Sequence, residues 1–298
     1  IHLFLRCHRL SKAIGTFSAM RSHNLTPDIR SWNRLLAHFN DAGLVDQVMI
    51  LYSEMVSSGV SPNVGTRNIV IHSLCKVGKV KEALVMLRGY NLSDTVSYNT
   101  VIWGFCKNGF QKAGLGLVSD MVKRRVKIDT FTCNILIKGF CEMGLLETAE
   151  FVMQMFSGSS NVYRDIVGFN TLIHGYCKVG DMNGAVRLTE KMREEGVLPD
   201  IVSYNILIHG FCKVGDFDRA KSLMDELLHS YEDVNVYNNK QQQNSDEGEN
   251  KESLVRRLDV QPNLITYTTL ITTYCKQHGV EEVLAIYEEL IMAVLFPD

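Results

Sequence analysis

Polar side chains that could hydrogen bond to a ligand recur along this chain in two matched sets, with a usual spacing of about 35 residues. The first set is Asn33, Asn68, Asn99, Asn134, Asn170, Asn205 and Thr268. The second set is Asn63, Asp94, Asp129, Asp165, Asp200, Asn263 and Asp298. An Asn amide both donates and accepts hydrogen bonds, whereas an ionised Asp only accepts. Such pairs could match the edge of a nucleobase, and repeat proteins read single-stranded RNA with two or three side chains per unit.

Cysteine is a second residue type with possible chemistry, since the chain has eight. Six of them occupy one recurring position: Cys75, Cys106, Cys141, Cys177, Cys212 and Cys275. No pair has the C-x2-C spacing of a metal site, and ligands spread along a repeat array rarely converge on one ion. We therefore predict small buried residues between helices, with no metal and no cofactor. Free thiols would suit a reducing compartment.

Cationic side chains form a further column, one residue after the recurring cysteine: Lys76, Lys107, Lys178, Lys213 and Lys276. Glu142 interrupts this column. The ammonium groups could contact phosphates, but lysines that satisfy a helix dipole explain the column equally well. Three histidines also recur, one turn beyond the first polar set: His72, His174 and His209. No nucleophile or acid recurs with them, so we predict no catalytic site.

An internal repeat predicts the elements that position these side chains. The phrase Val-Ser-Tyr-Asn-Thr-Val-Ile-Trp-Gly-Phe-Cys-Lys from Val96 returns in close variants from Val167, Val202 and Ile265. All five prolines are next to last in a unit: Pro27, Pro62, Pro199, Pro262 and Pro297. These marks divide the chain into a partial repeat, 1–28, and the repeats 29–63, 64–94, 95–129, 130–165, 166–200, 201–263 and 264–298.

Each repeat is predicted to form two antiparallel helices. The first carries an apolar stripe of helical period, as in Tyr204, Leu207, Ile208, Phe211 and Cys212. We expect the hydroxyls of Ser97, Ser203 and Thr266 to be N-caps. We expect left-handed C-cap glycines at Gly43, Gly78, Gly109, Gly144, Gly180 and Gly215. Because one hairpin cannot bury its apolar face alone, the fold class is an all-α solenoid of tandem helix-turn-helix repeats that form a superhelix.

Two repeats depart from the common length. The repeat at 64–94 is short, and the repeat at 201–263 is long. The surplus of the long repeat lies at about 231–258 and is rich in Asn, Gln and acidic residues. This composition predicts a disordered surface insertion between two helices, and a regulatory or partner-binding role is the alternative.

The recurring phrases, the period and the closing Pro-Asp or Pro-Asn resemble the pentatricopeptide repeat family. The resemblance covers nearly the whole chain, and the repeat lengths are similar to those of the family's pure-repeat class from plant organelles. The tetratricopeptide pattern fits worse, because its Trp-x2-Leu-Gly signature is missing. Since the chain begins at Ile1 without a leader and stops where a repeat ends, we expect a fragment from which a further domain could be missing. The resemblance implies a non-enzymatic protein that binds single-stranded RNA at one base per repeat.

The code attributed to the family assigns a base to each pair of polar residues. Asn with Asp implies U over C, Asn with Asn implies either pyrimidine, and Thr with Asp implies G. The implied site is 5′-YUUUUYG-3′, with its 5′ end at the first complete repeat. This agrees with simple chemistry, because Asp accepts from the ring N–H of U or G, whereas a closing Asn can turn its amide to donate or accept. Helix caps and ordinary Pro-Asp turns are the alternative explanation for these residues.

The resemblance also implies that the second residue of each repeat sandwiches the base. The residues that fit are Val96, Phe131, Val167, Val202 and Ile265. Arg30 and Gly65 depart from this pattern, and Gly65 offers no wall against a base.

Composition limits how such binding could work. A net charge of −2 is low for a nucleic-acid partner, so affinity must come from individually placed cations and from side chains that hold bases. No apolar run approaches the roughly 18 residues of a membrane helix, so we expect no membrane partner. The resemblance implies an organellar factor, in the mitochondrion or alternatively the chloroplast, that acts in RNA processing, stability, splicing or translation. A protein-binding scaffold is the rival hypothesis, although a scaffold has no reason to keep both polar sets in register.

Overall fold

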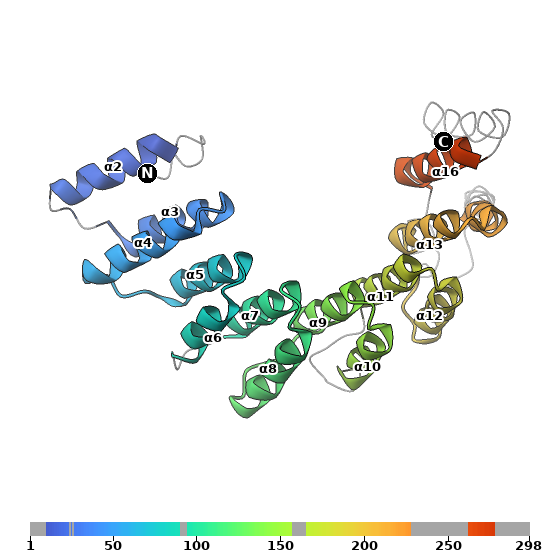
Figure 1. Cartoon of the computed structure of the whole chain (residues 1–298), viewed down its shortest axis with the longest axis horizontal. Helices are drawn as coiled ribbons and strands as arrows, with labels where there is room; N and C mark the ends of the chain where they lie inside the picture. Colours follow the sequence, from blue (N-terminus) through green and yellow to red (C-terminus); the bar gives the residue numbers. More distant parts are fainter. Residues whose placement is uncertain are drawn as a thin grey trace, which may run out of the picture. The chain divides into compact units, whose positions relative to one another are not determined.

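The computed structural model describes residues 10–23, 25, 27–89, 94–156, 165–227 and 262–277. This described part consists of α-helices joined by short turns and contains no β-strand (Figure 1). The all-α class predicted from the sequence is therefore confirmed. The proposed insertion at 231–258, the closing Asp298 and the side chains of Cys275 and Lys276 lie outside the described residues.

First and second helices of a hairpin alternate along the chain after α2 (Leu10–Ser22). The first helices are α3 (Ile29–Asp41), α5 (Val64–Lys76), α7 (Thr95–Lys107), α9 (Thr130–Glu142), α11 (Ile166–Val179), α13 (Ile201–Val214) and α16 (Leu264–Gln277). The second helices are α4 (Val45–Ser57), α6 (Val80–Arg88), α8 (Gln111–Lys123), α10 (Leu146–Phe156) and α12 (Met182–Glu194), and residues 217–227 are also helical. Helix α6, in the short repeat, has nine residues, whereas α4 and α8 have 13 each.

A glycine in the left-handed region ends the first helix of six hairpins, as predicted. The φ values lie between 73° and 85° at Gly43, Gly78, Gly109, Gly144, Gly180 and Gly215. Side chains with a Cβ rarely adopt this backbone conformation, which explains why glycine recurs at these turns.

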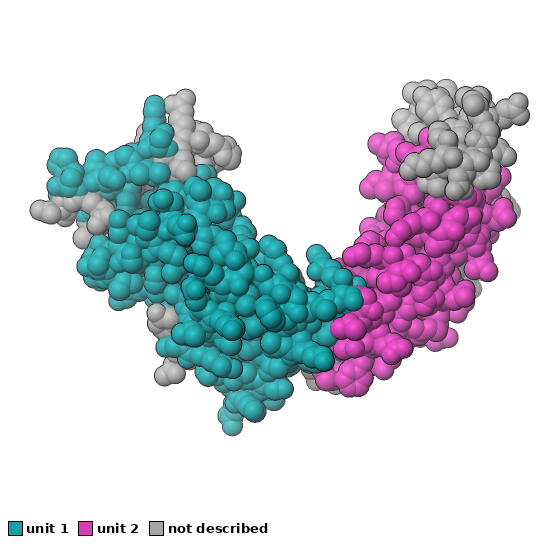
Figure 2. Space-filling view, in the orientation of Figure 1, with its two compact units in different colours: residues 1–143, 156–163 teal, residues 144–155, 164–298 magenta. Residues whose placement is uncertain are grey.

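The helices group into two compact units (Figure 2). The first comprises residues 1–143 and 156–163, and the second comprises 144–155 and 164–298. In the first unit, α3 packs on α5, α5 on α7, and α7 on α9; in the second, α11 packs on α13 and α13 on α16. The predicted stripe of α13 is buried at Leu207, Ile208, Phe211 and Cys212, while Tyr204 is half-buried. Successive first helices therefore share a continuous apolar core within each unit.

The recurring cysteine packs against a glycine on the first helix of the next repeat. A Cβ added to Gly104 would lie 2.6 Å from Cys75 Cβ, and one added to Gly139 would lie 2.7 Å from Cys106 Cβ. These cysteines are buried free thiols, as predicted. Burial raises the pKa of the Cys75 and Cys106 thiols to about 12, so both thiols are neutral near pH 7.

Candidate functional site

The residue that closes a repeat caps the first helix of the next repeat. Asp129, for example, has an extended backbone and accepts a hydrogen bond at Oδ1 from the backbone N–H of Thr132, 2.9 Å away. This bond satisfies one of the N–H groups that every helix leaves unpaired at its start. The same cap is made by Asp28, Asn63, Asp94, Asp165, Asp200 and Asn263. The cap interpretation of the second polar set is therefore correct, but it accounts for only one of its contacts.

The prediction that Ser97, Ser203 and Thr266 are N-caps is wrong. These residues lie inside the first turn of α7, α13 and α16, three positions after the true caps. An N-cap needs an extended backbone, which Asp94 and Asp200 have and residues within a helix do not. The three hydroxyls make other contacts.

The fifth residue of a repeat contacts its closing residue. Asn99 Nδ2 donates a hydrogen bond to Asp129 Oδ1 over 3.2 Å, although the residues are 30 positions apart. Three further pairs make this bond at 3.2 to 3.3 Å: Asn33 with Asn63, Asn170 with Asp200, and Asn205 with Asn263. The last pair is separated by 58 positions, so the long repeat brings its two polar residues together as the ordinary repeats do.

The remaining members of the two sets have other surroundings. Asn68 Oδ1 accepts a hydrogen bond from the Ser97 hydroxyl at 2.6 Å, and the same hydroxyl lies 2.7 Å from Asp94 Oδ1. Asn134 lies half-buried on α9, and Asp165 caps α11 in the other unit. Thr268 is exposed on α16, and its proposed partner Asp298 lies outside the described residues.

A buried hydroxyl contacts the Asn in five of the repeats, and sequence reasoning gave three of these hydroxyls the wrong role. Thr132 Oγ1 donates to Asn99 Oδ1 at 2.8 Å. The equivalent hydroxyls donate at 2.6 Å: Thr66 to Asn33, Ser97 to Asn68, Ser203 to Asn170 and Thr266 to Asn205. The signal in the sequence is a Ser or Thr two residues before most of the recurring Asn residues.

Capping determines which atoms the closing residue leaves for a ligand. Oδ1 of Asn263 accepts from the Thr266 backbone at 3.1 Å, so the amide is oriented with its oxygen inward. A free turn of this amide, as expected from the sequence, would replace that bond with a contact between two donors. Among the described residues, no hydrogen bond involves Asn263 Nδ2 or the Oδ2 atoms of Asp129 and Asp200. An Asp thus presents an acceptor, and an Asn presents a donor.

The charge state of one closing residue follows from its contacts. Burial raises the pKa of Asp94, but hydrogen bonds from the backbone and side chain of Ser97 outweigh burial and hold the pKa below its ordinary value. Asp94 is therefore ionised at neutral pH and only accepts hydrogen bonds.

Apolar side chains border the pairs. The second-position residues have exposed fractions between 50% and 64%: Val96, Phe131, Val167, Val202 and Ile265. At Gly65, an added Cβ would lie 3.4 Å from Asn63 Oδ1 and 3.7 Å from Asn33 Nδ2. The second residue of this repeat therefore adjoins the polar pair of the repeat before it.

Two lysines of the column contact the end of a neighbouring helix. Lys76 Nζ donates to the Asn40 carbonyl at 2.9 Å, and Lys213 Nζ donates to the Lys178 carbonyl at 3.0 Å. Both carbonyls lie near the end of the preceding first helix, where cations are favoured. Lys107 instead places Nζ 5.1 Å from the centroid of the Trp103 ring. An ammonium group has three donors, so a carbonyl contact leaves two free for another acceptor.

The recurring histidines lie beside these lysines. His72 stacks on Trp103, with ring centroids 5.1 Å apart, and hydrogen bonds to the Asn40 side chain. Burial and then the charge of the neighbouring lysines lower the pKa of His72 and of His174. Both rings are therefore neutral near pH 7.

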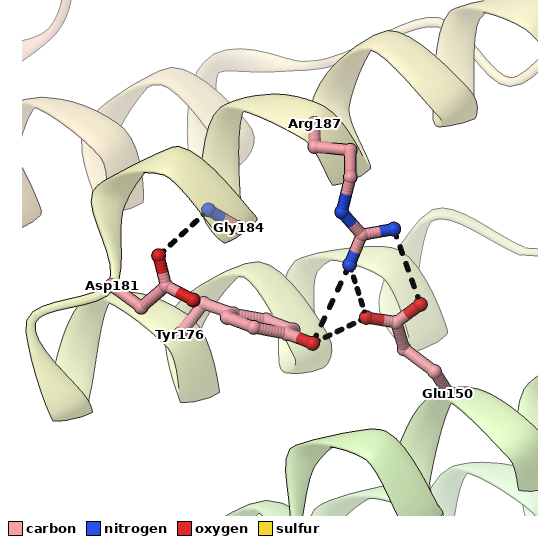
Figure 3. A network of polar contacts seen from close by, with 5 residues as sticks. All are labelled: Glu150, Tyr176, Asp181, Gly184 and Arg187. Carbon is pink, nitrogen blue, oxygen red and sulfur yellow. Dashed lines mark hydrogen bonds and ion pairs between the residues drawn. The ribbon is translucent and has the colours of Figure 1, made fainter.

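One polar cluster outside the pairs contains residue types found in catalytic sites; Glu150 and Tyr176 are buried in it, whereas Arg187 is exposed. Glu150 accepts hydrogen bonds from the Tyr176 hydroxyl and from Arg187, whose Nη2 is 2.5 Å from Oε1 (Figure 3). Burial raises the pKa of Glu150, but the bonds from Arg187 and Tyr176 lower it by more. Burial and the Glu150 carboxylate raise the pKa of Tyr176 to about 12. The ionised Glu150 thus forms an ion pair with the charged Arg187, and the neutral Tyr176 donates a hydrogen bond to the same carboxylate. These contacts link α10, α11 and α12.

The described part of the chain contains neither a metal-binding cluster nor a membrane-spanning helix. No three His, Cys, Asp or Glu side chains there are placed to hold a metal ion. None of the described helices has the length and apolar character needed to cross a bilayer.

Comparison with protein families identifies the repeats. A model of the PPR repeat family matches residues 27–76, 93–142, 164–213 and 199–237, which together make up more than half of the chain. A second model, of the PPR repeat, matches residues 66–89, 131–158 and 265–293.

Similar proteins occur in Arabidopsis thaliana. A chloroplastic pentatricopeptide repeat-containing protein is 26% identical over 204 residues, covering 66% of this chain and 26% of that protein. A mitochondrial pentatricopeptide repeat-containing protein is 32% identical over 228 residues, covering 65% of this chain and 24% of that protein. The chain thus spans about a quarter of the length of these two relatives.

Solved structures show the same fold. The crystal structure of the pentatricopeptide repeat protein PPR10 from maize matches 98% of this chain and 43% of its own, with a TM-score of 0.66 and 22% identity. PPR10 in complex with an 18-nt psaJ RNA element matches 95% of this chain and 38% of its own, with a TM-score of 0.61 and 19% identity. Since the family model covers more than half of the sequence, the chain belongs to the pentatricopeptide repeat family.

Proposed function

We propose that this chain binds single-stranded RNA and reads about one base per repeat with its fifth and closing residues. The observation that carries this proposal is the hydrogen bond between these two residues, which recurs at 3.2 to 3.3 Å in four repeats. Exposed apolar side chains beside the pairs supply walls for a base. The fold is compatible with such a ligand, since maize PPR10 has been crystallised with an RNA element.

The free atoms of an Asn–Asp pair suit uracil. Asn99 retains one N–H, and Asp129 retains Oδ2, so a donor lies beside an acceptor. Uracil offers a carbonyl oxygen and a ring N–H, which match this arrangement. Cytosine would bring the lone pair of its ring nitrogen against the carboxylate.

An Asn–Asn pair presents two donors instead. Asn205 and Asn263 each retain an N–H, because Oδ1 of Asn263 is used by the cap. The ring nitrogen and carbonyl of cytosine both accept, so cytosine is favoured over uracil at such a pair. The proposed site is therefore 5′-YUUUUYG-3′, with C preferred at each Y. The final G depends on Thr268 and Asp298 and rests on the sequence pattern alone.

Two further parts of the proposal concern register and the RNA backbone. The register, which assigns one base to each repeat, uses the repeats 29–63, 64–94, 95–129, 130–165, 166–200, 201–263 and 264–298.

The lysines of the column contact phosphates with the ammonium donors that their contacts within the protein leave free. In this account the lysines both stabilise the carboxyl ends of helices and attract the RNA strand.

We place this activity in an organelle. Mitochondria are the first choice and chloroplasts the alternative, because relatives of both kinds match the chain. By occupying one site, the protein would act in RNA processing, stability, splicing or translation without catalysing a reaction itself. A protein-binding scaffold remains the second candidate, but it gives no reason for the repeated hydrogen-bonded pairs.

The proposal is tested with short labelled RNAs in a fluorescence-anisotropy titration. One RNA carries 5′-CUUUUCG-3′ between adenosine flanks, and others replace a single central U with C or A. Each replacement should weaken binding by roughly tenfold or more, because a good polar base contact is lost. Equal affinity for all of these RNAs, or for the same sequence in a duplex, would contradict base reading and favour the protein-binding scaffold.

A further inference from the structure

We infer that the buried hydroxyl at the third position of a repeat is a positioning residue, which orients the base-reading Asn of the preceding repeat. This inference rests on the proposed function and assigns a third side chain to five of the reading sites. The hydroxyls belong to Thr66, Ser97, Thr132, Ser203 and Thr266. Their residues are between 0% and 4% exposed, although the residues directly before them, such as Val96 and Phe131, are more than half exposed.

The hydroxyl has a single proton and two acceptors within hydrogen-bond distance, the Asn oxygen and the closing oxygen. Thr132 Oγ1 accepts from the Asp129 backbone N–H at 3.3 Å and lies 2.8 Å from both Asn99 Oδ1 and Asp129 Oδ1. In the other four sites the hydroxyl is 2.6 Å from the Asn oxygen and 2.7 to 3.2 Å from the closing oxygen. The Asn oxygen is the nearer acceptor in each of these four sites.

The hydroxyl and the closing residue together hold both ends of the Asn amide. Asn99 Oδ1 receives the Thr132 proton, while Asn99 Nδ2 donates to Asp129 Oδ1. A turned amide would place two acceptor oxygens against each other. The base therefore meets a donor and an acceptor whose directions are set before binding, which reduces the ordering cost that binding must overcome.

The helix cap itself does not need this hydroxyl. Gly168 occupies the third position of its repeat and has no side chain, yet its backbone N–H donates to Asp165 Oδ1 at 2.8 Å. Asp165 is the N-cap of α11, with the same extended backbone as the other caps. A Ser or Thr at this position adds contacts to the closing residue, such as the bond from the Asp129 backbone N–H to Thr132, and it also adds the bond to the Asn.

The test is Thr132→Val in the full chain, which keeps the shape of the side chain and removes the hydroxyl. The measurement is the ratio of dissociation constants for two RNAs that carry U or C at the third base of the proposed site. We expect this ratio to fall about fivefold, the equivalent of one neutral hydrogen bond. Thr132→Ser, which restores a hydroxyl, should keep the wild-type ratio.

A matched control is Thr189→Val. Thr189 is also buried, at 5% exposure, but its hydroxyl donates to the Ala185 carbonyl within α12 at 3.0 Å. This variant should keep the U to C ratio even if its melting temperature falls as far as that of Thr132→Val. The ratio compares two RNAs on the same folded protein, so lost stability alone does not change it.

Every possible result for the U to C ratio either supports or overturns the role of the hydroxyl. An unchanged ratio in a folded Thr132→Val protein means that the hydroxyl has a structural role only, and it overturns the inference. If that variant does not fold, Ser203→Ala is measured at the fifth base, where Asn170 and Asp200 read. A wild-type protein that does not distinguish U from C contradicts the proposed function itself, which separates the two failures.

Discussion

At the scale of single residues, the proposed reading pairs are small polar groups, and four of them hydrogen bond to each other without a ligand. Asp129 uses one oxygen for the helix cap and for Asn99, and the other oxygen is left for a base. In the proposed function, capping and base reading are therefore two uses of one side chain. This explains why the closing position is restricted to Asp and Asn, which are both good caps but present opposite hydrogen-bonding groups outward.

Asn263→Asp should move the preference at the sixth base from C toward U. The change replaces an outward N–H with an acceptor, which attracts the ring N–H of uracil and repels the ring nitrogen of cytosine. Competition between C and U RNAs measures the shift, which should be about 1–3 kcal/mol. Asn205→Thr with Asn263→Asp should favour G, as proposed for Thr268 and Asp298. An unaltered preference in the double variant would show that Asn263 is not the reader of this repeat.

The sequence predicted these pairs because their period is regular, but it could not predict how their members share hydrogen bonds. Ser97 and Asp94 lie three positions apart and are both good N-caps, so composition alone favoured the wrong residue. The cap is determined by where the helix begins, at Thr95, and helix ends are the least certain part of a sequence-based prediction.

At the scale of helices, close approach between repeats depends on small residues. Cys75 and Gly104 lie on successive first helices, and the glycine leaves room for the thiol of its neighbour. The sequence predicted buried cysteines but not their glycine partners, because the contact joins two repeats and follows from helix packing. The cluster of Glu150, Tyr176 and Arg187 was missed for another reason, since it does not recur and periodicity cannot detect it.

Gly104→Ala should destabilise the fold by about 1–3 kcal/mol, because the new Cβ would overlap Cys75 and force the helices apart. Thermal or urea unfolding followed by circular dichroism measures the change. Gly116→Ala is the control on α8, where an added Cβ meets no atom within 4 Å. This control should stabilise the protein by about 0.5–1 kcal/mol. Equal effects of both substitutions would mean that the Cys75 contact is not tight.

The Glu150 ion pair predicts a pH dependence of stability. Because its pKa is below the ordinary carboxyl value in the folded protein, Glu150 stabilises the fold fully above that ordinary value. The contribution is lost as the pH falls through the lowered pKa. The difference in melting temperature between wild type and Glu150→Gln should therefore be largest near neutral pH and shrink on acidification. Glu147→Gln, at an exposed position of the same helix, should show no such trend, and a constant difference for Glu150→Gln would contradict this assignment.

At the scale of the whole molecule, net charge limits how the protein could hold RNA in the proposed function. The chain has 31 basic and 33 acidic residues, so it has no general excess of positive charge to attract a polyanion. Binding in this account depends on the bases themselves, held by polar pairs and apolar walls. In this account, the five lysines of the column supply only a small number of phosphate contacts.

A weak salt dependence should follow. Each phosphate neutralised on a single strand contributes about −0.7 to the slope of log affinity against log salt concentration. The lysine column therefore predicts a slope no steeper than about −3.5, measured between about 50 and 200 mM salt. Lys213→Gln should make the slope shallower by about 0.7 without changing which base is preferred. A slope near −7 would show that phosphate contacts dominate and that the lysine column is not the main source of them.

Selection of bound RNAs from a random single-stranded pool tests the central claim most directly, because it imposes no site on the protein. The account predicts enrichment of 5′-YUUUUYG-3′ with C favoured at each Y, in the order of the repeats from the first to the last. Enrichment of purine-rich sequences, or no enrichment of any sequence, would contradict base reading by the fifth and closing residues.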